Sequence, residues 1–135
     1  MFSVKRFAEY ENGFGNVAKE YWMGLKKISA LTANGRWELR VELVDFDGKK
    51  YFAGYDNFKV ENRRPYKLRI SGYQKRSTLE NAFSGHNGMG FTTIDQDNDK
   101  CDCHCGILYG AWWYRHCHSS NLNGMNYNKR KSIVI

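Results

Sequence analysis

The stretch of sequence that decides the fold runs from residue 110 to residue 124 and reads GAWWYRHCHSSNLNG. Its adjacent tryptophans, Trp112 and Trp113, are expected in the core, because large rings contribute much of a small domain's buried surface. After them, His116 and His118 flank Cys117. Imidazoles and thiolates ligate metals, and a cysteine can instead form a disulfide. The stretch therefore combines core residues with candidate site residues.

Just upstream lies a run of alternating acids, Asp95-Gln96-Asp97-Asn98-Asp99. On an irregular loop such spacing turns several carboxylates toward one point, and calcium takes six to eight oxygen ligands in flexible geometry. The run is not an EF-hand, because Lys100 stands where that loop has its glycine and Gly106 where it has its glutamate. From the residues alone, a calcium loop and a solvated acidic turn both remain open.

Four cysteines follow within residues 101–117: Cys101, Cys103, Cys105 and Cys117. With the neighbouring histidines they could ligate zinc, although cysteines at every second position do not match the usual C-x2-4-C pairs. Alternatively, Cys105 and Cys117 close a short disulfide loop. A direct Cys101–Cys103 bond is disfavoured by strain across one intervening residue, so these two are predicted to be free or paired outside the chain.

The first half of the chain predicts a helix followed by antiparallel strands. Apolar residues at helical spacing, with Asn16 as a cap, predict a short helix over residues 16–25. Alternation over residues 37–43 predicts a half-buried strand. The dipeptide Asp47-Gly48 is a strong hairpin signal, so a return strand is expected over residues 49–60.

A third short strand is predicted at Tyr66, Leu68 and Ile70, which alternate with polar residues. From residue 71 onward glycine, asparagine and aspartate recur and the periodicity fades. Such a long ordered loop region needs clamps such as a metal or a disulfide.

Composition narrows the class of protein. Hydrophobic residues make up 41% and charged residues 26%, as in a folded globular domain. The charge of +7 permits an anionic partner, but the basic residues are scattered, which argues against a nucleic-acid groove. No apolar stretch approaches the ~20 residues of a membrane span, and no apolar region follows Met1–Arg6 as it would in a signal peptide. No histidine has a serine or cysteine at catalytic motif spacing, so no enzyme is predicted.

The order of these pieces resembles the fibrinogen C-terminal (fibrinogen-related) domain of ficolins, tachylectins and tenascins. The segments YENGFG at 10–15 and EYWMGL at 20–25 are similar to the family's Y-x-x-G-F-G and E-F-W-L-G-L. In register follow LRVEL at 39–43, FTTIDQDND at 91–99 and the run at 110–124. The match covers about residues 7–124, and its last run, with the acids before it, is highly specific.

The resemblance implies an α+β fold, with a short helix and an antiparallel sheet followed by a loop-rich calcium and disulfide subdomain. It divides the chain, read as a partial domain over 1–135, into a helix and sheet part at 7–70, a calcium and ligand part at 71–124, and a divergent tail at 125–135. It implies Ca²⁺ as the cofactor, held by the side chains of Asp97 and Asp99. Backbone carbonyls of Cys101 and Cys103 would complete the protein ligands.

The resemblance also implies a Cys105–Cys117 disulfide, a cis peptide between His116 and Cys117, and a ligand pocket beside them. In lectin-like members that pocket holds acetyl groups of N-acetylated sugars. By position, the residues that would form the pocket here are Tyr109, Tyr114, His116, Cys117 and His118.

The implied function is a secreted, calcium-binding, lectin-like module for acetylated glycans or extracellular proteins, in innate immunity or in the extracellular matrix. The chain is shorter than the family domain at both ends, so a last strand of the central sheet is expected to be missing and oligomerisation is expected to use regions outside this chain. The alternative from the residues is an intracellular zinc-binding domain built on the cysteines and histidines.

Overall fold

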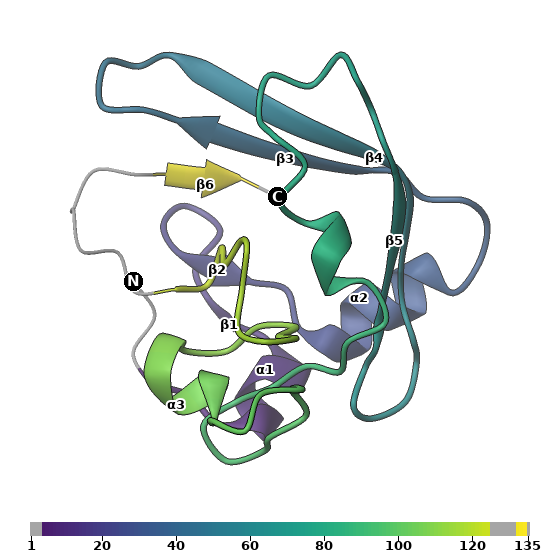
Figure 1. The fold of residues 1–135 in the computed structure, drawn as a ribbon, viewed down its shortest axis with the longest axis vertical. Helices are drawn as coiled ribbons and strands as arrows, with labels where there is room; N and C mark the ends of the chain where they lie inside the picture. The colour runs from purple at the N-terminus through teal and green to yellow at the C-terminus, as the bar shows by residue number, and fades with distance from the viewer. Residues whose placement is uncertain (1–3, 125–131, 135) are drawn as a thin grey trace.

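The computed structural model describes residues 4–124 and 132–134. Its main element is a four-stranded antiparallel sheet of order β5-β4-β3-β6 (Figure 1), formed by Leu68–Tyr73, Lys50–Val60, Leu39–Val44 and Ser132–Val134. The three strands predicted from the first half are confirmed as β3, β4 and β5. β6 pairs with Glu42–Val44 of β3 at the edge of the sheet. The absence of the family's own last strand stays a prediction.

The turn between β3 and β4 forms where the sequence predicted it. Gly48 has φ 83°, a conformation that favours glycine. Asp45 closes the turn, because its Oδ1 accepts hydrogen bonds from the backbone N–H groups of Asp47 and Lys49 at 2.9 Å each. Local turn chemistry therefore fixes the hairpin register, in which Leu39 lies opposite Tyr55.

The helix predicted over residues 16–25 is wrong. Asn16 caps a turn instead of a helix, since its Oδ1 accepts a hydrogen bond from the Ala18 N–H at 2.9 Å. The chain then forms a small hairpin of β1 (Phe14–Gly15) and β2 (Tyr21–Trp22). A Cβ on Gly13, which has φ 91°, would lie 2.4 Å from the Met23 carbonyl oxygen. The backbone of residues 13–15 therefore packs closely against residues 20–23, and the chain forms a hairpin there in place of the predicted helix.

Two helices flank that hairpin: α1 (Phe7–Asn12) precedes it and α2 (Leu25–Thr32) follows it. α2 packs against both α1 and β4. Figure 1 shows α1 next to α3 (Cys105–Tyr109), at the opposite end of the molecule from the β3–β4 turn. The short η1 (Ser84–His86) lies beside β5.

The core is largely aromatic. Phe91 lies at its centre and packs against Trp22, Tyr10 and Trp113, with ring centroids 5.7, 5.3 and 5.0 Å apart. Trp112 is fully buried and stacks on Phe83 at 5.2 Å. The two tryptophans of the deciding stretch therefore lie in the core, as predicted. These rings join the loop-rich half of the chain to α1 and the small hairpin.

Candidate functional site

The acidic loop begins with a tight turn that uses Asp95 for structure. Thr93 and Gln96 exchange backbone hydrogen bonds. The Oδ1 of Asp95 accepts bonds from the Thr93 hydroxyl at 2.6 Å and from the Phe7 N–H at 2.9 Å. Burial alone would raise the pKa of Asp95, but these hydrogen bonds lower it. Asp95 therefore ties the loop to the start of α1 and is occupied as an acceptor.

The next two acids converge with a histidine. Side-chain ligand atoms of Asp97, Asp99 and His104 all lie within 4.8 Å of one another. Asp97 is exposed and Asp99 half-buried, so a cation could enter from solvent. The sequence pattern placed the histidines next to the cysteines, His104 among them, as possible zinc ligands and gave no sign that His104 lies beside the aspartates. Its Nδ1 is buried and has no hydrogen-bond partner in the described part of the chain.

Asp99 connects this cluster to α3. Its Oδ1 accepts the Cys101 N–H and its Oδ2 the Cys105 N–H, both at 2.9 Å. Cys105 is the first residue of α3, and Gly106 follows it. A Cβ on Gly106 would lie 2.7 Å from the Thr93 carbonyl oxygen, so α3 lies directly against the turn that starts the acidic loop.

All four cysteines are in disulfides. Cys105–Cys117 pairs as the resemblance implied, while Cys101–Cys103 corrects the prediction that these two would be free or paired elsewhere. Their Cα atoms are 4.9 Å apart, within the range that a disulfide spans. With no free cysteine in the chain, zinc has no thiolate ligand here, although the four sulfurs lie within 4.8 Å of one another.

The predicted pocket residues meet only in part. Tyr109 and His118 form an edge-to-face pair with ring centroids 4.8 Å apart, and Tyr114 lies 6.0 Å from His118. Tyr114 is fully buried, and burial raises its pKa. His116 is exposed and has no ring contact with these residues in the described structure.

The predicted cis peptide before Cys117 is wrong. In the described chain Arg64–Pro65 is the cis bond, and Cys117 instead has φ 57°. The Cys117 carbonyl also accepts a hydrogen bond from the Arg115 N–H at 3.2 Å. The bend at residues 115–117 therefore comes from a left-handed residue in a trans chain.

A second histidine, which the sequence did not mark as functional, positions the pocket segment. His86 is 2% exposed and lies 2.7 Å through Nδ1 from the Trp113 carbonyl oxygen. Its Nε2 accepts the N–H groups of Ser119 and Ser120 at 3.3 and 3.2 Å. Nδ1 therefore carries the proton and donates to Trp113. The motif His86-Asn87-Gly88 was the available signal, but nothing in it reveals a partner more than 30 residues away.

Comparison with known proteins fits this geometry. The family model for the C-terminal globular domain of fibrinogen beta and gamma chains matches residues 2–134. The chain belongs to this family. The match includes β6, while most of the tail predicted to diverge, residues 125–135, lies outside the described residues. Because the family consists of extracellular recognition modules, this fibrinogen C-terminal domain is a recognition domain and not an enzyme.

Relatives cover most of this chain but extend beyond it. Human tenascin-R is 45% identical over 97% of the chain and 10% of its own length, and human ficolin-3 is 40% identical over 89% and 40%. The fibrinogen-like globe domain of human ANGPTL2 superposes with a TM-score of 0.86 at 41% identity, over 93% of this chain and 58% of that one.

Lamprey fibrin D-dimer, solved with the peptide ligand Gly-His-Arg-Pro-amide, also gives a TM-score of 0.86. Its identity is 32%, over 93% of this chain and 45% of that one. The α+β fold predicted from the sequence is thus confirmed. No helix in residues 4–124 or 132–134 is long and apolar enough to cross a membrane.

Proposed function

We propose that this fibrinogen C-terminal domain is a secreted, lectin-like module in which a calcium-ordered loop supports a pocket for an acetamido group. The observation that carries the proposal is the link through Asp99 between the carboxylate cluster and α3. That helix ends at Tyr109, whose ring contacts His118. A cation at Asp99 would therefore hold the pocket's wall in place without touching the sugar.

The donor set supports calcium. Asp97 and Asp99 offer carboxylate oxygens, which calcium prefers. Neither the Cys101 nor the Cys103 carbonyl accepts a hydrogen bond in the described chain, which leaves both oxygens available. When bound, the ion would supply a positive charge that offsets the two neighbouring carboxylates.

The pocket offers partners for an acetamido group. The rings of Tyr109 and His118 would cover its methyl. The N–H groups of Cys117 and His118, which donate no hydrogen bond in the described chain, would bond its carbonyl. Such a site buries little area, so single-site affinity should be weak and useful binding should depend on several copies. Oligomerisation would then come from regions outside this chain. The two disulfides fit an oxidising, extracellular compartment.

The test is binding to N-acetylglucosamine beads, with elution by acetate and by EDTA. His118→Ala should lower affinity about tenfold, which is about 1.4 kcal/mol. His116→Ala is the matched control, since that imidazole is exposed and outside the ring contacts. Equal binding by all three proteins, with no competition by acetate, would reject the acetamido pocket. Acetate competition that EDTA leaves unchanged would reject calcium support alone.

A peptide is the second candidate ligand. On α3, Ile107 and Leu108 are 59% and 50% exposed next to Tyr109, and exposed apolar side chains next to a pocket suit a protein partner. The lamprey neighbour was solved with a peptide ligand. Competition for the beads by Gly-His-Arg-Pro-amide but not by acetate would favour this candidate.

A further inference from the structure

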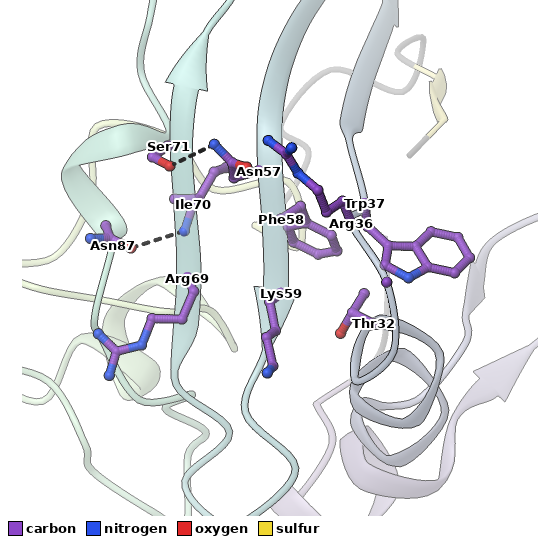
Figure 2. Close-up of a pocket in the computed structure, with 11 residues that line it drawn as sticks. Thr32, Arg36, Trp37, Asn57, Phe58, Lys59, Arg69, Ile70, Ser71 and Asn87 are labelled. Atoms are coloured by element: carbon purple, nitrogen blue, oxygen red, sulfur yellow. Dashed lines mark hydrogen bonds between the residues drawn. The ribbon is translucent and has the colours of Figure 1, made fainter.

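A hollow in the structure lies away from the acidic loop. It has a volume of about 400 Å³, within the ~300–1,000 Å³ typical of ligand pockets. β4 and β5 form one side, and the loop after α2 forms the other (Figure 2). The acidic loop, α3 and residues 109–118 contribute nothing to its lining.

The lining is cationic. Arg36, Lys59 and Arg69 line the hollow, and none of the lining residues is acidic. Arg69 pairs with Glu61 at 3.1 Å. Arg36 and Lys59 have no carboxylate partner among the residues that the structure describes.

The strand register places two of these cations face to face. Lys59 on β4 lies directly opposite Arg69 on β5, so the two side chains leave the same face of the sheet (Figure 2). Like charges at directly opposed positions destabilise a sheet. Glu61 already offsets part of the charge of Arg69. An anion held near Lys59 and Arg69 would remove the remaining repulsion, so the arrangement favours a bound anion.

Aromatic and amide groups complete the hollow. Trp37 is 37% exposed, and Phe58 is half-buried beside it. Asn87 uses its Oδ1 to accept the Ile70 N–H at 2.9 Å, which leaves its Nδ2 donors open. Asn57 donates Nδ2 to the Ser71 hydroxyl at 3.2 Å, which leaves its Oδ1 as an acceptor. A sugar could stack on the aromatic rings, and its hydroxyl groups could hydrogen-bond the amide donor of Asn87 and the amide acceptor of Asn57.

We propose that this hollow binds an anionic saccharide, with a sulfate or carboxylate group at Lys59, Arg69 and Arg36 and a sugar ring against Trp37. The cations are gathered around one hollow and do not form a stripe along the molecule, which a nucleic-acid backbone would need. The site is separate from the proposed calcium-supported pocket, so each can fail without the other.

The probe is a sulfated heparin-derived tetrasaccharide, titrated calorimetrically into the 135-residue chain at low and at physiological salt. Lys59→Gln should weaken binding about fivefold, and the affinity should fall less steeply with salt than for the unmodified chain. Trp37→Ala should weaken binding about tenfold, while Trp37→Phe should retain it, because the ring is the contact. Because Lys59 is exposed, Lys59→Gln should fold. It therefore tests the proposed site even if Trp37→Ala does not fold.

Lys50→Gln is the matched control, because it removes the same charge from an exposed position on β4 about 30 Å away along the strand. It should change affinity less than twofold. Equal losses for Lys50→Gln and Lys59→Gln would overturn the proposal in favour of attraction by the net charge alone. Binding of an octathymidylate as tight as the tetrasaccharide, and equally sensitive to Trp37→Ala, would overturn it in favour of a nucleic acid.

Discussion

His86 makes the pocket segment sensitive to pH at the scale of one residue. Burial lowers the pKa of His86, although its hydrogen bond with Trp113 opposes this, and the electrostatic effect of His118 and Arg115 lowers it further. The neutral ring is the one that can accept the Ser119 and Ser120 N–H groups. Protonation of Nε2 would place its N–H against the N–H groups of Ser119 and Ser120, so both of these hydrogen bonds to His86 would break.

The free energy of unfolding should therefore fall as pH drops below about 6.5, since the unfolded chain then binds a proton that the folded chain resists. The slope from this group is at most about 1.4 kcal/mol per pH unit. Urea denaturation at pH 7.5 and 5.5 measures it. His86→Gln should flatten the slope. An unchanged slope in His86→Gln would contradict this role.

At the scale of an element, α3 depends on one glycine. Gly106→Ala should destabilise the chain by about 1–3 kcal/mol, because the new Cβ meets the backbone of Thr93 and the methyl of buried Thr92, neither of which can rotate away. Helix propensity alone would favour alanine by about 1 kcal/mol, so the sign of the change tests the contact.

The matched control is Gly85→Ala in η1, where a Cβ has nothing within 4 Å. It should leave the thermal midpoint almost unchanged. If both alanines shift the midpoint equally, α3 does not depend on close approach to Thr93.

Elements could be predicted where local sequence determines them. β3 and β4 follow from alternation and from a turn closed within residues 45–49. The convergence of Asp97 and Asp99 follows from alternating acids, and the disulfide at Cys105 and Cys117 from the resemblance. The prediction of a helix over 16–25 was wrong because it used only the apolar spacing. Gly13 and Gly15 both have φ 91°, a conformation that favours glycine and that here accompanies the β1–β2 hairpin.

Other features depend on contacts that no local pattern contains. α1 was missed because the Asp95 carboxylate that binds its first N–H lies 88 positions later in the chain. His104 was assigned to the cysteines because it stands between two of them, and only the fold turns it toward the aspartates. The Cys101–Cys103 bond was rejected on strain, although the loop brings the two Cα atoms to 4.9 Å.

For the whole molecule, calcium should raise the thermal midpoint. A ligand that binds only the folded state at 100 times its Kd adds about 2.7 kcal/mol to the free energy of unfolding. Differential scanning calorimetry with calcium and with EDTA measures the shift. Asp97→Asn should abolish it, whereas Asp102→Asn, an exposed acid outside the cluster, should keep it. A shift that survives Asp97→Asn would place the ion elsewhere.

The bond between Phe7 and Asp95 also constrains the order in which this domain folds. During synthesis α1 leaves the ribosome early, yet the acceptor for its first amide and the ring of Phe91 that packs on Tyr10 arrive some 80 or more residues later. Contacts between such distant residues slow folding, because a long loop must close before they form. The contacts of Phe7 and Tyr10 with Phe91 therefore form only after the second half of the chain is made. During that interval the incomplete aromatic core leaves the nascent chain most open to chaperones and to aggregation.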